Sequence, residues 1–319
     1  MSDLKQSDAD RSALNRRQLL KCGAWASAGL VWSLSGGVPF ATSFADTVDR
    51  KAAGLRFVQI SDSHIGFHKD ANPDSTGTLQ AAMSQVVQLA PQFVLHTGDV
   101  SHLSKPEEFD TAQQVIGSYR GNVHYVPGEH DVIGDNGNAF FTRFNKSADR
   151  KWYSFDAHGV HFVGLVNVLD LQAGGFGKLG NEQLEWLEQD LKHRSHSTPL
   201  ILFTHMPLWT VYPDWGWGTD DAAQALSYVR RFGSVTVLNG HIHQVLQKVE
   251  GNVRFYSAMS TAFPQPAPGT APSPGPMKVP AEKLKQVLGI RDVVVQAHGR
   301  EASIRDQSLD QTDAMRGAA

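Results

Sequence analysis

Five separate apolar runs in this chain each end in an acidic or histidine side chain. The first run lies within residues 55–65, contains β-branched residues as buried strands do, and stops at Asp62 and His64. The four later runs with the same plan cover residues 93–99, 123–131, 200–205 and 235–243. In an open α/β sheet the carboxyl ends of the strands lie along one crevice, where ligands bind. We therefore expect a fold in which five strand ends supply one polar site.

The segments between these runs have helical character, so strands and helices alternate along the chain. Residues 79–89 carry apolar side chains at helical spacing, and Pro106 with the two acids after it is typical of a helix start. Residues 181–191 show an amphipathic pattern with leucines on one face. Beyond residue 243 the pattern changes to hairpins, the last of them over residues 290–308. The alternation predicts a layered α/β domain whose later strands are largely antiparallel.

Composition limits the classes of function. The chain has 319 residues, of which 41% are hydrophobic and 19% are charged, as in a globular protein with one large domain or two small ones. A formal net charge of -3 argues against a nucleic-acid-coating surface, which would be strongly basic. Residues 263–280 are rich in Pro, Gly, Ala and Ser, and we expect them to form a surface loop with little regular structure.

A pair of arginines near the start of the chain precedes a weakly apolar segment. Arg16 and Arg17 come before residues 22–38, and Ser43 and Ala45 offer small side chains at the -3 and -1 positions of a cleavage site. This pattern is typical of a twin-arginine export signal. The apolar segment contains Ser and Gly and falls short of roughly 18 clean apolar residues, which argues against a stable membrane anchor.

The export signal determines the compartment that we expect. Residues 1–45 would be read by the twin-arginine export machinery and removed, and the mature domain, residues 46–319, would be periplasmic or secreted. The only cysteine, Cys22, would leave with the signal, so the mature chain would have no disulfide.

The polar groups at the strand ends form short motifs in a fixed order. Along the chain the motifs are Asp62-x-His64, Gly98-Asp99, Gly128-Glu129-His130-Asp131, His205 and Gly240-His241-x-His243. Any one of them is weak evidence, because a Gly-Asp pair occurs by chance in most proteins. Together and in this order they resemble the calcineurin-like metallophosphoesterase superfamily over residues 55–260.

The resemblance implies a fold and a reaction. The fold would be an α/β sandwich of two mixed β-sheets flanked by helices. The reaction would be metal-dependent hydrolysis of a small phosphate ester, either a monoester or a diester, with a hydroxide that bridges two metal ions as the nucleophile. Two divalent ions about 3.5–4 Å apart can clamp the attacking and leaving oxygens of an in-line displacement. Imidazole combined with carboxylate suits Fe, Mn, Zn or Ni better than Mg alone.

The resemblance also implies a role for each motif residue. The first ion would be held by Asp62, His64 and His243, the second by Glu129, His205 and His241, and Asp99 would bridge them. His130 would stabilise or protonate the leaving oxygen, and Asp131 would orient the His130 ring. In an extended strand, His241 and His243 would face the same crevice because the pleat has a period of two. The motif glycines would let the backbone turn tightly beside the ions.

One motif residue departs from the family pattern. The family usually has Asn where this chain has Glu129, so three carboxylates instead of two would surround the ions. Two divalent ions, three carboxylates and a hydroxide sum to zero charge, whereas the Asn form would keep one positive charge. We expect weaker attraction for phosphate dianions, or a preference for one trivalent ion such as Fe(III). Alternatively, the longer Glu129 side chain could stand off the metal and act as a base.

Aromatic residues crowd the loop that follows His205. They are Trp209, Tyr212, Trp215 and Trp217, within a segment interrupted by Gly and Pro. The loop could be a substrate-binding platform that stacks on an aromatic or nucleoside leaving group, or a packed lid. Both readings remain open.

Histidines outside the motifs have a simpler explanation. A lone His on a strand is more often structural than a ligand. We expect this of His96, His102, His124, His158, His161 and His298. A rival to the hydrolase is a metal-binding protein of the same fold with weak or no turnover, which Glu129 would favour. His130 and Asp131 favour the enzyme, because neither residue is needed merely to hold metal.

Overall fold

The computed structural model describes most of the chain beyond the predicted export signal. The described residues are 33–35, 38–40, 53–145, 151–169, 171–172, 174–296 and 302–310. The predicted signal, residues 1–45, lies almost entirely outside them, as does His298. Within the signal region, β1 (Ser33–Ser35) and β2 (Val38–Phe40) pair antiparallel in a sheet of their own.

The first of two large sheets has five strands in the order β13-β12-β3-β4-β5. Its strands are β3 (Ala53–Ile60), β4 (Phe93–His96), β5 (Asn122–Tyr125), β12 (Gly289–Gln296) and β13 (Ala302–Ser308). The pairs β3/β4 and β4/β5 are parallel, and β12 is antiparallel to both β3 and β13. The predicted C-terminal hairpin is therefore present, and it completes this sheet.

The second large sheet has six strands in the order β10-β11-β9-β8-β7-β6. Its strands are β6 (Tyr153–Ala157), β7 (Val160–Gly164), β8 (Leu200–Thr204), β9 (Val235–Asn239), β10 (Leu246–Glu250) and β11 (Val253–Ser257). Pairing is parallel from β7 through β8 and β9 to β11, and it ends in an antiparallel hairpin on each side. Both large sheets are therefore mixed, as the predicted fold class requires.

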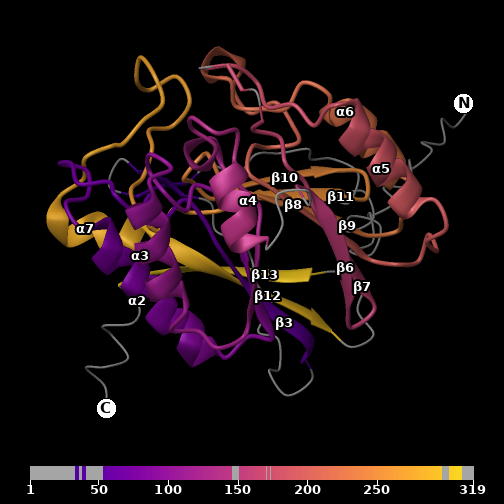
Figure 1. Cartoon of the computed structure of the whole chain (residues 1–319), viewed down its shortest axis with the longest axis horizontal. Coiled ribbons are helices and arrows are strands. Elements are labelled where there is room, and N and C mark those ends of the chain that lie inside the picture. The colour runs from indigo at the N-terminus through magenta and orange to yellow at the C-terminus, as the bar shows by residue number, and fades with distance from the viewer. Residues whose placement is uncertain are drawn as a thin grey trace, which may run out of the picture.

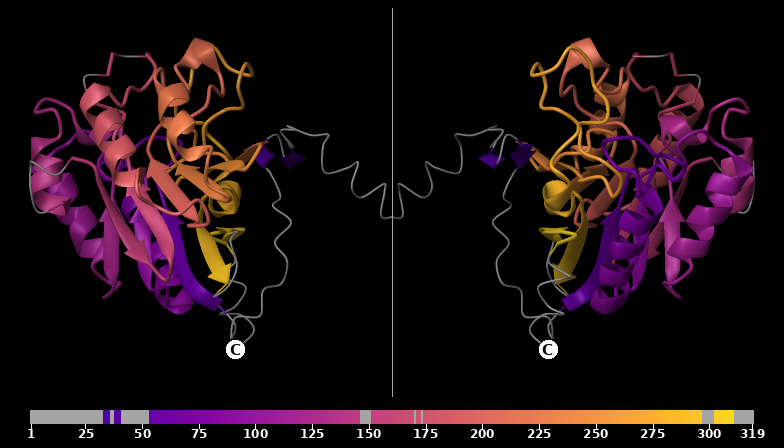
Figure 2. Two further views of the ribbon diagram at one scale, coloured as in Figure 1. Left: turned by 90° about the vertical axis from the view of Figure 1, so that its right-hand side faces the viewer. Right: turned by 90° about the vertical axis from the view of Figure 1, so that its left-hand side faces the viewer.

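The two sheets pack face to face, with helices on the outer faces (Figures 1 and 2). Phe57 and Phe93 of one sheet meet Phe162 and Phe203 of the other in a buried core. Helices α2 (Ser75–Leu89), α3 (Pro106–Ile116) and α4 (Asn138–Phe144) cover the five-stranded sheet, and α5 (Asn181–Leu191) and α6 (Ala222–Val229) cover the six-stranded sheet. The predicted α/β sandwich with two mixed sheets and flanking helices is confirmed.

Element boundaries follow local sequence signals, with two differences from expectation. Helix α2 begins at Ser75, four residues before the expected start, because the Asp74 carboxylate accepts a hydrogen bond from the Gly77 N–H (2.8 Å) and caps the first turn. Helix α7 (Ala281–Val287) was not expected from the sequence. None of the helices in the described ranges is both long enough and apolar enough to cross a membrane.

Candidate metal centre

The seven candidate metal ligands converge at one edge of the sandwich. Asp62 and His64 follow β3, Asp99 follows β4, Glu129 follows β5, His205 follows β8, and His241 and His243 follow β9. They form two groups, each with its ligand atoms within 4.8 Å of one another: Asp62, His64, Asp99 and His243 in the first, and Glu129, His205 and His241 in the second. Five strand ends therefore do supply one site, with the grouping that the resemblance implies.

Asp99 lies between the two groups. Its Oδ2 is 3.4 Å from His64 Nε2 in the first group and 3.4 Å from His205 Nε2 in the second. Its Oδ1 accepts a hydrogen bond from the backbone N–H of His130 (2.9 Å), which helps to hold the carboxylate between the two groups. The geometry allows Asp99 to serve both groups.

Five of the seven ligand candidates have a left-handed backbone. The φ angles are 53° at Asp62, 40° at His64, 53° at Asp99, 66° at His241 and 58° at His243. The expectation that a pleated strand aligns His241 and His243 is wrong, because β9 ends at Asn239 and both residues lie in a turn. Backbone hydrogen bonds between loops from neighbouring strands hold this conformation, such as Asp62 N–H to the Gly98 carbonyl (2.9 Å).

The motif glycines allow these loops to touch. A Cβ on Gly128 would collide with the Asp99 carboxylate, and a Cβ on Gly240 would collide with Ser61 and Asp62. Gly98 has a φ of 95° and lies directly against the His205 ring. The predicted tight turns beside the ligands are therefore present, and each one requires glycine.

Hydrogen bonds to carbonyl groups orient two of the ligand histidines. His205 Nδ1 donates to the Thr97 carbonyl (2.7 Å), and His243 Nδ1 donates to the Phe263 carbonyl (2.6 Å). A neutral imidazole with its proton on Nδ1 has a lone pair on Nε2, the atom that each ring directs into the site. This is the arrangement expected of histidines that bind metal.

The groups fit metal ions better than they fit one another. Asp62 Oδ2 is buried without a hydrogen-bond partner, and His205 Nε2 faces only carboxylate oxygens, with Glu129 Oε2 at 2.8 Å and Asp99 Oδ2 at 3.4 Å. Burial opposes a charged ring, but the Asp99 and Glu129 carboxylates outweigh it and hold the pKa of His205 well above its ordinary value. The cluster therefore favours the binding of positive charge. Its imidazole and carboxylate donors fit a pair of transition-metal or zinc ions.

Glu129 is part of the second group. Its Oε2 lies 2.8 Å from His205 Nε2, and its Oε1 lies 3.0 Å from His241 Nδ1. These contacts place the carboxylate among the ligand candidates of the second group. Whether Glu129 binds an ion or stands off it as a base stays a prediction.

His130 and Asp131 have different partners from those expected. His130 Nδ1 donates to the His102 carbonyl (2.7 Å), so the His130 ring is not oriented by Asp131. The Asp131 carboxylate is fully buried and instead accepts hydrogen bonds from the backbone N–H groups of Val100, Ser101 and Gly128. The predicted orienting role of Asp131 is wrong, because its carboxylate instead joins the loops after β4 and β5.

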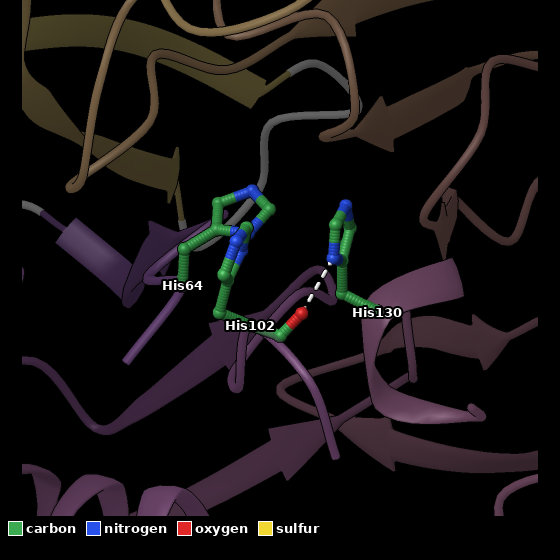
Figure 3. Close-up of side chains that lie close together, drawn as sticks. All are labelled: His64, His102 and His130. Carbon is green, nitrogen blue, oxygen red and sulfur yellow. Dashed lines mark hydrogen bonds between the residues drawn. The ribbon is translucent and has the colours of Figure 1, made fainter. Parts of the chain in front are cut away.

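His102 is a residue of the site that the sequence reasoning assigned to structure. Its ring lies beside those of His64 and His130, as Figure 3 shows, and its Nδ1 is 3.4 Å from His64 Nδ1. The available signal was its position three residues after Asp99, on the same loop.

A pocket of about 640 Å³ opens next to the second group. Glu129, His130 and His241 form its polar side. Most of the remaining wall is apolar and includes Val132, Ile133, Val168, Leu171, Met206, Trp215, Trp217 and Pro274. The site therefore combines a cluster of Asp, Glu and His side chains with an adjoining, mostly apolar pocket.

The aromatic loop contributes only partly to this pocket. Trp215 and Trp217 line it, although Trp217 is 0% exposed and Trp215 only 7%, so they form a packed wall. Trp209 packs on Phe255 and Lys248, and Tyr212 packs edge-on against Trp215. Neither Trp209 nor Tyr212 is among the described residues that line the pocket, so their substrate-binding role stays a prediction.

The proline-rich segment is attached to the site at its first residues. Phe263 is 3% exposed, and the Gln265 side chain donates to the His241 carbonyl (2.9 Å) and accepts from the Gly275 N–H (3.2 Å). Gln265, Pro274 and Gly275 line the pocket. The segment lacks regular structure as expected, but it is a wall of the site and not merely a surface loop.

Comparison with known proteins agrees with this geometry. The family model described as calcineurin-like phosphoesterase matches residues 55–245, more than half of the chain. A 3',5'-cyclic-nucleotide phosphodiesterase of Nostoc sp. is 26% identical over 66% of this chain and 79% of that protein. A 3',5'-cyclic adenosine monophosphate phosphodiesterase of Escherichia coli K12 is 26% identical over 66% of this chain and 77% of that protein.

Solved structures show the same fold at lower identity. A dimetal phosphatase from Danio rerio has a TM-score of 0.56 at 15% identity, covering 81% of this chain and 99% of that one. A purple acid phosphatase from yellow lupin has a TM-score of 0.55 at 14% identity, covering 80% of this chain and 52% of that one. Together with the ligand cluster, the family match shows that the chain belongs to the calcineurin-like phosphoesterase family and is a metal-dependent phosphoesterase.

Proposed function

We propose that this protein is a phosphodiesterase that uses two metal ions to hydrolyse small phosphodiesters. The first candidates are 3',5'-cyclic nucleotides. The observation that carries the proposal is the charge of the site. No lysine or arginine is among the described residues that line the pocket, and Glu129 adds a carboxylate there.

The charge of the site distinguishes diesters from monoesters. A phosphodiester carries one negative charge, whereas a phosphomonoester near neutral pH carries up to two, since its second pKa is about 6. With the Asp62, Asp99 and Glu129 carboxylates around two divalent ions, little positive charge remains to attract a dianion. The pocket offers no basic side chain to compensate. The names of the Nostoc and Escherichia coli relatives support the same choice of substrate.

Each side chain has a proposed part in this reaction. Asp62, His64 and His243 would hold one ion, Glu129, His205 and His241 the other, and Asp99 both. When bound, a pair of such ions supplies Lewis acidity that activates water and neutralises charge on the phosphate oxygens. His130, whose Nδ1 is held by a carbonyl, would present Nε2 to the leaving oxygen and give it a proton. The wall formed by Trp215 and Trp217 would pack against the leaving group.

The choice of ions follows from the same charges. We propose Fe, Mn, Zn or a similar metal at both positions, with one trivalent ion such as Fe(III) as the alternative that restores positive charge. Metal analysis of protein purified after expression in media containing each metal would distinguish the two arrangements.

Assays on matched substrates test the diesterase proposal. We expect a bis-aryl phosphate and 3',5'-cyclic AMP to be hydrolysed with a higher kcat/KM than the corresponding aryl phosphate, in the presence of Mn, Zn, Fe or Ni. Glu129→Asn should lower the KM for the aryl phosphate and the inhibition constant of inorganic phosphate. Glu129→Gln removes the charge but keeps the length of the side chain, so comparing the two variants separates the effect of charge from that of length. A wild-type preference for the monoester, or unchanged phosphate affinity in both variants, would overturn the proposal.

We further propose that the enzyme acts in the periplasm or outside the cell. The support is the paired Arg16 and Arg17 ahead of a short apolar segment. Fractionation of cells that produce the full chain should place the wild type outside the cytoplasm and retain the Arg16→Lys/Arg17→Lys variant inside. Equal distribution of the two would refute export through the twin-arginine machinery.

A further inference from the structure

His102 contacts both a ligand candidate and the proposed proton donor. It lies on the loop after β4, and its half-buried ring stacks nearly parallel to the His130 ring, with centroids 5.0 Å apart at 14°. The edge of Phe67 packs against its other side, with centroids 5.2 Å apart at 86°. Figure 3 shows the rings of His64, His102 and His130 gathered from three different loops. The orientation of the His102 ring is therefore closely defined.

The orientation of His64 determines where its proton must be. Its Nε2 faces the site, 3.3 Å from His243 Nε2 and 3.4 Å from Asp99 Oδ2. A histidine that binds metal through Nε2 must keep a lone pair there, so its proton resides on Nδ1 and needs an acceptor. That Nδ1 is 3.4 Å from His102 Nδ1. His102 is then the acceptor and carries its own proton on Nε2.

This acceptor differs from those of two other ligand candidates. The Nδ1 atoms of His205 and His243 donate to the main-chain carbonyls of Thr97 and Phe263, which no substitution removes. The Nδ1 of His64 faces a side chain instead. Its orientation and tautomer therefore depend on the identity of residue 102.

The backbone of His102 acts on the second residue. Its carbonyl accepts the hydrogen bond from His130 Nδ1 (2.7 Å), which leaves Nε2 as the atom that can meet a leaving group. The His102 N–H in turn donates to the Ile65 carbonyl (2.9 Å) and to Glu108 Oε2 (3.2 Å), so the loop itself is anchored. One residue thus sets the orientation of a metal ligand and of a proton donor.

We infer that His102 is a positioning residue whose imidazole accepts the His64 Nδ1–H, and whose carbonyl holds the His130 ring for proton transfer at Nε2. The inference rests on the metal-ligand role proposed for His64. It concerns hydrogen bonds to the metal-binding side chains from residues that do not touch the metal. Loss of such a bond in metalloproteins typically costs about 10–100-fold in metal affinity or activity.

Two substitutions separate the acceptor from the packing. Asn at residue 102 places an amide oxygen near the position of the His Nδ1 and can still accept, whereas Phe keeps the ring packing on His130 and removes the acceptor. We expect His102→Phe to weaken Mn²⁺ binding at the first group about 10–100-fold, and His102→Asn to stay close to wild type. At saturating Mn²⁺ the KM for a bis-aryl phosphate should be unchanged in both variants. His124→Phe, which replaces a histidine on β5, is the matched control.

Nitrogen NMR of the Zn²⁺-loaded protein at pH 8 gives a readout that needs no activity. We expect the proton of His64 on Nδ1 in the wild type and in His102→Asn, and a mixture of tautomers in His102→Phe. A wild-type His64 with its proton on Nε2, or equal Mn²⁺ affinity in the wild type and both variants, would overturn the inference. A third equivalent of metal that disappears in His102→Phe would also overturn it, because His102 would then be a ligand.

The two proposals fail in different ways. If Mn²⁺ affinity follows the acceptor at residue 102 but no phosphodiester is hydrolysed, the positioning role stands and the diesterase proposal is wrong. If diesters are hydrolysed but the Mn²⁺ affinity and the His64 tautomer do not depend on residue 102, only the positioning role is refuted.

Discussion

The two sheets contribute different chemistry to one site. The five-stranded sheet supplies every candidate carboxylate ligand through the loops after β3, β4 and β5, together with His64. The six-stranded sheet supplies only histidines, through the loops after β8 and β9. Each group combines residues from both sheets, so neither sheet can hold an ion with the observed ligands by itself. The face-to-face packing of the sheets is therefore a functional feature as well as a structural one.

The largest expected effect comes from the carboxylate that both groups share. Asp99→Asn removes the charge between His64 and His205, so we expect loss of the second equivalent of metal. The fall in kcat/KM should exceed the roughly 100-fold that loss of an outer contact costs. Metal analysis and hydrolysis of a bis-aryl phosphate measure both effects. The control is Asp70→Asn, which removes an exposed carboxylate that pairs with Lys278 on the surface. Two retained ions with near-normal turnover would contradict a shared role for Asp99.

Loss of packing between the two sheets should have the second-largest effect. Phe162 of the six-stranded sheet is fully buried and meets the rings of Phe57 and Phe93 edge-on, with centroids 5.4 and 5.3 Å away. We expect Phe162→Ala to lower the free energy of unfolding by about 3–5 kcal/mol, as measured by urea denaturation. Val87→Ala, at a 49% exposed position on α2, should cost far less. Similar losses in the two variants would mean that the sheet interface contributes little.

His124 on the five-stranded sheet and Asp190 beside the six-stranded sheet should respond differently to acid. Burial lowers the pKa of His124, on β5 of the five-stranded sheet, to about 4. In the unfolded chain this pKa is about 6.5, so the unfolded state binds the extra proton and stability falls as the pH drops from about 6.5 to 4. The full loss is about 3 kcal/mol. His124→Phe keeps an aromatic ring against Phe155 and should reduce this part of the pH dependence, as urea denaturation at several pH values would show. If the free energy of unfolding of His124→Phe depends on pH as that of the wild type does, this role of His124 is refuted.

The six-stranded sheet should respond at lower pH. His161 on β7 contacts Asp156 (2.9 Å) and Asp190 (2.7 Å). Burial raises the pKa of Asp190, but hydrogen bonds with His161 and Ser154 outweigh it and lower that pKa below its ordinary value. The contribution of Asp190 is therefore present above the unfolded pKa of about 3.9 and is lost as the pH falls through the lower folded value.

Asp190→Asn should cost about 1–2 kcal/mol at pH 7, because the hydrogen bonds lose their charge. The difference from the wild type should stay constant down to about pH 4 and shrink below it. A difference that instead disappears well above pH 4 would contradict this role of the Asp190 carboxylate.

The convergence of the candidate ligands was predictable from the sequence, and the reason is topological. Strand-end residues such as Asp62 and Asp99 converge because neighbouring parallel strands end at the same edge of a sheet, so apolar runs that end in Asp, Glu or His indicated the site. The backbone conformation was not predictable, because hydrogen bonds between loops impose it, as in Asp62 N–H to Gly98. The same limit explains the errors at Asp131 and His102, whose partners lie on loops from other strands.

The aromatic loop shows a second limit. Sequence places Trp209 and Trp215 in the same segment, yet only Trp215 faces the pocket. Which side of an irregular loop a ring occupies depends on the core that it covers. A Gly- and Pro-interrupted segment has no periodicity from which this could be inferred.

The left-handed residues of the metal centre imply a conflict between durability and catalysis. Five candidate metal ligands occupy backbone positions where glycine would sit without penalty and where other residues typically cost about 1 kcal/mol each. Replacing these residues by glycine would remove that penalty while removing the donors for the ions. The chain therefore has a strained backbone at this edge of the molecule, and bound cations would compensate for the strain.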